Sequence, residues 1–186
     1  MAARKTAKAL PPLRLDLGCG TRKKEGFTGV DSIKFDGVDV VADLRKRWPW
    51  KDGTVDEIHC SHFIEHLTAR ERVHFCNEAY RVMKPGAQMT LIAPHGGSGR
   101  AYGDMTHQWP PVWEFWFYYL SKEWRTTNAP HDDARWSPGG YDCNFEVSWW
   151  HALRPDLLSR NQEYQTYALA NYKEAAQDIV ATFKKA

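Results

Sequence analysis

The chain has 186 residues, a formal net charge of +2 at pH 7, 42% hydrophobic residues and 26% charged residues. These values are typical of one globular domain with a sizeable core, and they exclude a low-complexity or disordered chain. No apolar run approaches the roughly 18 residues that a membrane-spanning helix needs, so we expect no membrane partner. The small net charge neither requires nor excludes a nucleic-acid partner.

Residues 1–12 are basic and rich in Ala. They lack the apolar core of a secretory signal, so we expect a flexible basic arm and a cytoplasmic protein. The cysteines form no CxxC pair, which disfavours a zinc site or a redox motif. We expect all four to be reduced thiols: Cys19, Cys60, Cys76 and Cys143.

Short apolar segments alternate with turns in the first half of the chain. Residues 67–83 have apolar side chains at helical spacing, and Thr68 with Glu71 predicts a capping box at the helix start. The sequence Lys84-Pro85-Gly86 ends this helix, because Pro cannot continue it. We expect strands at residues 13–17, 27–31, 38–42, 55–60 and 88–93. This alternation predicts an α/β fold with a mostly parallel sheet flanked by helices.

The pattern is less regular after residue 94. It predicts a flexible loop at 96–103, an aromatic helix at 112–120, a mobile loop at 128–142, a late strand at 144–153 and a long C-terminal helix at 163–185. We expect the C-terminal helix to pack on the sheet or to form a homodimer contact.

The chain therefore divides into three parts within a single domain at residues 13–186. We expect a cofactor-binding half at 13–95, a substrate or lid half at 96–160, and the C-terminal helix at 161–186.

The glycine turn after the first expected strand is the most informative feature of the sequence. Residues 13–20 are LRLDLGCG, and Gly29-Val30-Asp31 follows at the end of the next strand. Glycines let the backbone approach a ligand that a side chain would block. An acid at a strand end can accept hydrogen bonds from both ribose hydroxyls. The layout predicts a nucleotide-type cofactor at the carboxyl ends of the strands.

Five motifs, in this order, resemble the class I S-adenosylmethionine-dependent methyltransferases, and especially their compact type 11-like group. They are LDLGCG at 15–20, GVD at 29–31, ADL at 42–44, HFIEHL at 62–67 and RVMKPG at 81–86. The resemblance covers about residues 13–95 and implies a Rossmann-like sheet with an antiparallel late strand. Three features depart from the family: a short segment between Gly20 and Asp31, no third glycine in the turn, and Ala87 where a second glycine is common.

The resemblance also implies S-adenosyl-L-methionine as cofactor. The glycine turn would lie near its methionine carboxylate, Asp31 would bind the ribose, and Asp43 with the Leu44 backbone would lie beside the adenine. The alternative is that these residues have no binding role. The glycines would then form an ordinary tight turn, Asp31 would be a solvated loop acid, and Asp43 would be the N-cap of the next turn. The expected cofactor-binding residues are Asp16, Leu17, Gly18, Cys19, Gly20, Asp31, Ser32, Asp43, Leu44, Ser61 and His62.

Two histidines are candidates for a general base. His62 follows the fourth strand, where the resemblance places the reactive methyl group. Asp104 precedes His107 by three residues and can orient its ring, although the two can equally cap the aromatic helix. His62 and His66 have the i, i+4 spacing of a metal pair on a helix, but there is no HExxH motif, so we expect no metal site.

The sequence leaves the methyl acceptor open. We expect an oxygen or nitrogen nucleophile on a small molecule, with the aromatic residues of 109–119 either walling its pocket or belonging to the core. The basic triplets at 22–24 and 45–47 favour a nucleic-acid acceptor as the alternative. A non-catalytic module that binds the cofactor to regulate a partner is a second alternative. A nicotinamide-dependent dehydrogenase is disfavoured by the missing third glycine.

Overall fold

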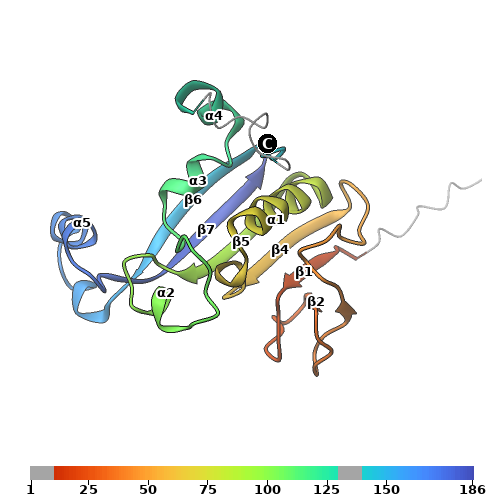
Figure 1. Ribbon diagram of the computed structural model, residues 1–186, viewed down its shortest axis with the longest axis horizontal. Helices are drawn as coiled ribbons and strands as arrows, with labels where there is room; N and C mark the ends of the chain where they lie inside the picture. The colour runs from red at the N-terminus through yellow and green to blue at the C-terminus, as the bar shows by residue number, and fades with distance from the viewer. Residues whose placement is uncertain (1–10, 130–139) are drawn as a thin grey trace, which may run out of the picture.

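The computed structural model describes residues 11–129 and 140–186, which form a seven-stranded sheet (Figure 1). The strand order is β3-β2-β1-β4-β5-β7-β6. Neighbours from β3 to β5 are parallel, whereas β7 is antiparallel to both β5 and β6. The strands are β1 (Arg14–Leu17), β2 (Thr28–Asp31), β3 (Val40–Val41), β4 (Val55–Ser61), β5 (Met83–Pro94), β6 (Phe145–Leu153) and β7 (Ala176–Lys185). The expected Rossmann-like fold with an antiparallel late strand is confirmed.

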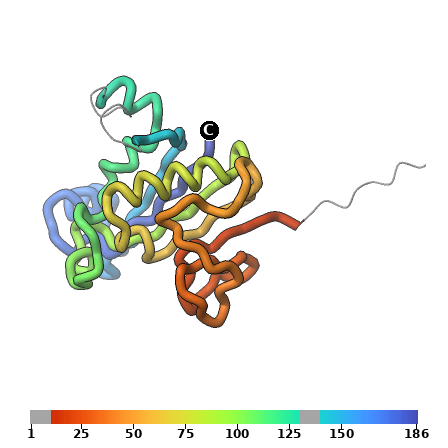
Figure 2. Tube along the Cα trace, turned by 45° about the vertical axis from the view of Figure 1, so that its right-hand side comes forward, coloured from red at the N-terminus to blue at the C-terminus, as the bar shows by residue number. Residues whose placement is uncertain are grey.

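Helix α1 (Ala69–Val82) is the longest helix among the described residues and lies over β4 and β5 (Figures 1 and 2). Thr68 and Glu71 form the expected capping box at its start. Its buried side chains include Phe75, Cys76 and Ala79, which join the main hydrophobic core beneath it. The shorter helices are η1 (Ile64–His66), α2 (Arg100–Gly103), α3 (Phe115–Tyr118), α4 (Lys122–Asn128), η2 (Pro155–Leu157) and α5 (Gln162–Asn171).

The two faces of the sheet differ in polarity because strand side chains alternate. In β1, Leu15 and Leu17 are fully buried in the core below α1, while Asp16 between them faces the other side. There Asp16 accepts hydrogen bonds from His59 Nδ1 and from the backbone N–H of Lys24, each at 2.7 Å. The short segment between β1 and β2 thus packs on this face without a crossover helix.

The expected C-terminal helix is wrong over most of its length. Helix α5 ends at Asn171, and residues 176–185 form β7 between β5 and β6. Ile179, Val180 and Phe183 are β-branched or aromatic residues that favour strands, and all three are buried. Pairing with a strand on each side decides their conformation. A homodimer contact through a long helix at 161–186 therefore loses its basis.

Other local predictions also need correction. The aromatic helix expected at 112–120 is a single turn, α3, and the loop expected at 96–103 contains α2. Most of the loop expected at 128–142 lies outside the described residues. The expected late strand is confirmed as β6, and its neighbour β7 lies in the centre of the antiparallel part of the sheet.

All four cysteines are free thiols, as expected, and all four are buried. Burial raises the pKa of the Cys60 and Cys76 thiols well above the usual value, so neither is an activated nucleophile. In the part of the chain that the structure describes, every helix is too short or too polar to cross a membrane.

Candidate active site

A pocket of about 540 Å³ lies at the carboxyl ends of β1 and β4. Parallel strands bring their carboxyl ends to one edge of the sheet, which is where α/β folds bind ligands. Six of the expected site residues line this pocket: Asp16, Gly18, Cys19, Gly20, Ser61 and His62. His59, Thr21 and Arg100 also line the pocket and were not predicted, and Arg22 was predicted only as part of a basic triplet.

The glycine turn has the backbone that its sequence predicts. Gly18 and Gly20 have φ values of 69° and 51°, a region that favours glycine. A Cβ atom on Gly18 would lie 2.4 Å from Cδ2 of Phe63, so this glycine is needed for packing. A Cβ atom on Gly20 would meet no described atom within 4 Å, so this glycine borders open space beside the pocket. The turn forms a cradle whose backbone a ligand can approach.

Asp31 anchors that turn from the end of β2. Its Oδ2 accepts a hydrogen bond from the Gly20 backbone N–H at 3.0 Å, and its Oδ1 accepts one from the Ile33 N–H at 3.1 Å. Each carboxylate oxygen has a second lone pair for a ligand hydroxyl. The half-buried Asp31 lies beside the pocket without being part of its lining.

Four further residues expected at the cofactor lie outside the lining. Leu17 is fully buried in the core, and Ser32 is exposed. Asp43 binds Arg45 Nε at 2.8 Å, and this hydrogen bond lowers the pKa of the Asp43 carboxyl to about 2. Leu44 is buried, with its carbonyl accepting from Trp48 Nε1 at 3.1 Å. Asp43 comes two residues after the end of β3, which is the parallel neighbour of the strand that ends at Asp31, and it does not line the pocket.

His62 stands at the pocket wall in an unusual backbone conformation, with φ of 53°. Its Nδ1 lies 3.4 Å from Glu65 Oε1, and its Nε2 lies 4.0 Å from Asp178 Oδ2. The hydrogen bond to Glu65 raises the pKa of His62 despite its partial burial. Helix η1 begins only at Ile64, so the expected placement of His62 and His66 on one helix is wrong.

Asp104 and His107 do not form the expected orienting pair. Asp104 Oδ2 lies 3.9 Å from His107 Nε2, and Asp104 Oδ1 accepts hydrogen bonds from Thr106 instead. The ring of His107 is held by the Ala101 carbonyl, 3.2 Å from Nδ1. Neither residue lines the pocket or caps α3, which begins at Phe115. His107 lies instead against His66, with ring centroids 4.8 Å apart.

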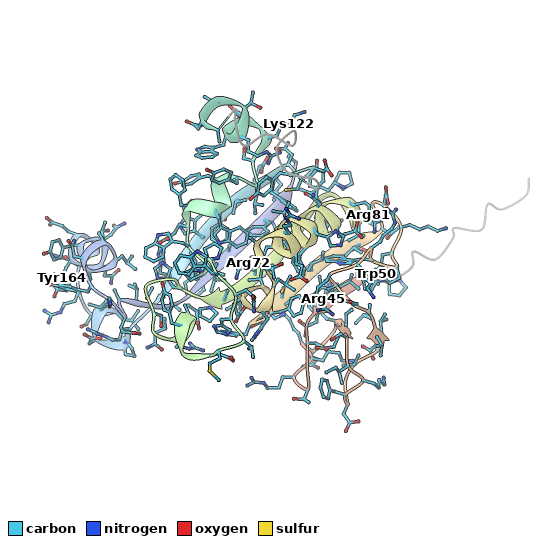
Figure 3. All side chains as sticks on the ribbon, in the orientation of Figure 1. Arg45, Trp50, Arg72, Arg81, Lys122 and Tyr164 are labelled. Atoms are coloured by element: carbon cyan, nitrogen blue, oxygen red, sulfur yellow. The ribbon has the colours of Figure 1, made fainter. Side chains whose placement is uncertain are left out.

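Arg72 is a positioning residue that the sequence analysis missed. Arg72 lies on α1 (Figure 3). Its side chain is buried, and the guanidinium donates to backbone carbonyls on two segments of the chain. The acceptors are Ile64, Glu65, Leu67, Gln108 and Pro110. A signal was present, because Arg72 occupies the same helical stripe as the buried Phe75, Cys76 and Ala79. A charged residue on an apolar stripe indicates a buried polar role.

Comparison with known proteins agrees with the geometry. Residues 22–91 match the family model of a methyltransferase domain. Comparison with curated proteins gave no match.

Two similar solved structures have the same fold. A SAM-dependent methyltransferase from Archaeoglobus fulgidus superposes with a TM-score of 0.66 at 21% identity, covering 94% of this chain and 86% of that one. A SAM-dependent methyltransferase from Methanosarcina mazei gives 0.56 at 16% identity, covering 95% and 94%. At these identities the structures establish the fold.

Proposed function

We propose that this chain is a class I S-adenosylmethionine-dependent methyltransferase of the type 11 group, and that it methylates an oxygen or nitrogen nucleophile of a small molecule. The pocket between the glycine turn and the end of β4 is the observation that carries this proposal. Its volume of about 540 Å³ lies in the range of small-ligand sites.

The residues present fit the cofactor. Gly20 borders open space in a backbone cradle, and Asp31 keeps lone pairs for two hydroxyls while holding the turn. We assign the methionine end of the cofactor to the turn at Gly18–Gly20 and the ribose to Asp31. We assign the adenine to the segment after β3 that contains Asp43 and Leu44, outside the pocket lining.

When bound, the cofactor supplies a methyl group on a sulfonium, which is a strong electrophile with a good leaving group. The chain's own residues therefore have to align the acceptor, exclude water and remove a proton where the acceptor requires it. Alignment alone can supply roughly 7–11 kcal/mol in favourable cases.

We assign the proton-accepting role to His62. It lines the pocket, and Glu65 at 3.4 Å engages Nδ1, which leaves Nε2 on the side of Asp178. General-base help contributes about 10²–10⁴-fold to the rate. Replacing His62 by Asn should reduce turnover within this range for a hydroxyl acceptor, and should leave most of the turnover for an amine that is already neutral.

Charge pairing favours a small molecule over a nucleic acid. Three of the six cations in the two basic triplets are paired: Lys23 with Asp39 at 2.9 Å, and Arg45 and Lys46 with Asp43 at 2.8 and 3.7 Å. These cations are already neutralised locally, which weakens their value as phosphate contacts. After β5, Tyr102 in α2 and Trp109 in the loop beyond α2 are 57% and 77% exposed. Such exposed aromatic side chains suit a flat or apolar acceptor.

Calorimetric titration with S-adenosylmethionine, S-adenosylhomocysteine and NAD tests the cofactor first. We expect micromolar binding of the first two and none of NAD. A labelled-methyl screen of hydroxylated and amine small molecules, with RNA and DNA in parallel, then tests the acceptor. Transfer to nucleic acid alone would overturn the small-molecule proposal, and tight cofactor binding without turnover on any acceptor would favour the regulatory module.

A further inference from the structure

We propose that Glu65, His66 and His107 bind one divalent transition-metal ion beside the cofactor pocket. Each residue offers one ligand atom, and these three atoms lie within 4.8 Å of one another. The site replaces our expectation of no metal, which rested on the spacing of His62 and His66. Its third ligand, His107, belongs to a loop about 40 positions after His66 in the chain.

Among the described residues, His107 has a hydrogen-bond partner only at Nδ1, while its Nε2 lies 3.9 Å from Asp104 Oδ2, beyond hydrogen-bond distance. A backbone carbonyl only accepts, so the contact of 3.2 Å between Nδ1 and the Ala101 carbonyl requires a proton on Nδ1. In the neutral ring, Nε2 then carries the lone pair. A second ring nitrogen that donates to a carbonyl is the usual support of a metal-bound histidine.

His66 also has its Nδ1 held by a hydrogen-bond acceptor, which here is the hydroxyl oxygen of Thr106. Asp104 Oδ1 accepts from both the backbone N–H and the hydroxyl of Thr106, at 2.8 and 2.7 Å. The single hydroxyl proton is therefore used, and the Thr106 oxygen accepts from His66 Nδ1 at 2.9 Å. His66 Nε2 is left with a lone pair. The rings of His66 and His107 meet edge to face, with centroids 4.8 Å apart.

Glu65 supplies the independent evidence for a ligand. Its side chain is only 5% exposed, and its Oε2 has no hydrogen-bond partner among the described residues. A buried carboxylate oxygen without a partner is costly, and coordination of a metal is one of the ways in which proteins offset that cost. The other oxygen, Oε1, is 3.4 Å from His62 Nδ1, so Oε2 is the atom that remains for an ion.

The backbone around the three residues is firmly connected. The Gln108 N–H donates to the Glu65 carbonyl at 2.8 Å, and Arg72 donates to the carbonyls of both residues. Bonds of about 2.0–2.2 Å to nitrogen and oxygen require ligand atoms roughly 3–3.5 Å apart. The three ligand atoms lie within 4.8 Å of one another, so binding an ion requires the side chains to move closer together while this backbone stays in place.

The donor set indicates the class of ion. Two imidazoles and one carboxylate, with open positions, suit Zn²⁺, Fe²⁺, Mn²⁺ or Co²⁺, whereas Ca²⁺ and Mg²⁺ prefer oxygen ligands. Because Glu65 contacts His62 on the pocket wall, the ion would lie next to the acceptor. If the proposed function holds, the ion would bind an acceptor oxygen and lower its pKa, which favours hydroxylated acceptors over amines.

A second cluster of His95, Glu114 and His151 lacks these features. The Gly97 N–H donates to His95 Nδ1 at 3.1 Å, so His95 Nε2 carries the proton and donates to Glu114. Glu114 is also bound by His151 Nε2 at 2.5 Å. Because His95 Nε2 and His151 Nε2 both donate to Glu114, neither offers that nitrogen's lone pair to an ion, and this cluster serves as a control.

Metal binding is tested on the full chain after chelation and dialysis. Co²⁺ and Zn²⁺ are titrated, with the visible absorption of Co²⁺ and the bound metal per chain as readouts. We expect one equivalent to bind, and we expect Glu65→Gln, His66→Ala and His107→Ala each to weaken binding by at least about 100-fold. His74→Ala and His151→Ala should bind like the parent protein. His66 is exposed, so its variant should fold normally.

Three results would overturn the site: no saturable binding by the parent protein, unchanged binding in His66→Ala and His107→Ala, or loss of binding in His151→Ala instead. Calorimetry with S-adenosylmethionine on the same variants separates this proposal from the methyltransferase proposal. We expect His107→Ala to lose the metal and retain cofactor affinity, because His107 does not line the pocket.

Discussion

The backbone N–H of Gly20 donates a hydrogen bond of 3.0 Å to Oδ2 of Asp31. This contact joins the glycine turn after β1 to the acid at the end of β2, eleven positions away along the chain. Asp31 therefore has two tasks, because it holds the turn in place and presents its remaining lone pairs to a ligand. The two motifs form one structural unit.

Replacing Asp31 by Ala should weaken the binding of S-adenosylmethionine and S-adenosylhomocysteine by about 10–100-fold. The change removes hydrogen bonds to a charged acceptor, each of which contributes about 1.5–3 kcal/mol, and releases the Gly20 turn. Calorimetry measures the affinities. Asp36→Ala, an exposed acid on the following loop, is the matched control and should bind like the parent protein. Equal affinity in both variants would refute the assignment of Asp31 to the ribose.

Gly18 and Gly20 should respond differently to replacement by Ala. Gly18→Ala should lower the free energy of unfolding by about 2–4 kcal/mol, because it adds a clash with Phe63 to the strain of a positive φ. Gly20→Ala meets open space, so it should cost only about 1–2 kcal/mol of strain while reducing cofactor affinity.

Gly53→Ala is the control for strain alone, since Gly53 has φ of 63° and open space but lies away from the pocket. Urea unfolding and calorimetry on the three variants separate packing, strain and binding. A Gly20 variant that binds the cofactor as tightly as the Gly53 variant would contradict the cradle.

Arg72→Lys should be nearly as damaging as Arg72→Ala. A lysine has three donors at one point and cannot reach carbonyls on both η1 and the loop at 108–110. We expect each variant to lose about 2–4 kcal/mol of the free energy of unfolding, because buried carbonyls are left without donors. Chemical denaturation measures the loss. Recovery of full stability in the Lys variant would show that charge matters here and that geometry does not.

Glu114 should make the stability of the chain depend on acid. Burial raises its pKa, but hydrogen bonds from His151 and His95 outweigh burial and hold the pKa well below the usual 4.5. A carboxyl group whose pKa is lower in the folded state than in the unfolded state stabilises the fold at pH values above its unfolded-state pKa. This stabilisation is lost as the pH falls from the unfolded-state pKa toward the folded-state pKa. The groups that face Glu114 are His95 after β5 and His151 on β6.

Glu114→Gln removes this carboxylate at nearly constant volume. The variant should be less stable than the parent protein by about 1–2 kcal/mol at about pH 7, and the difference should shrink as the pH falls below about 4.5. Denaturation curves across that range provide the measurement. A constant difference at all pH values would mean that the charge of Glu114 contributes nothing.

Local patterns in the sequence were sufficient for the first half of the fold. The capping box at Thr68 and Glu71, the alternating strands and the two glycines at positive φ each depend on residues close together in the chain. The same local signals identified the pocket at the ends of β1 and β4, because parallel strands must bring those ends to one edge.

The tertiary structure alone decided the rest. Residues 176–185 have the length and composition of a helix end or of a strand, and pairing with β5 and β6 on both sides selects the strand. His107 meets Glu65 and His66 only because Arg72 and the Gln108 N–H join two segments that the sequence separates by about 40 residues. Spacing along a chain determines local structure, whereas a cluster built from distant segments depends on packing and buried hydrogen bonds that no local pattern contains.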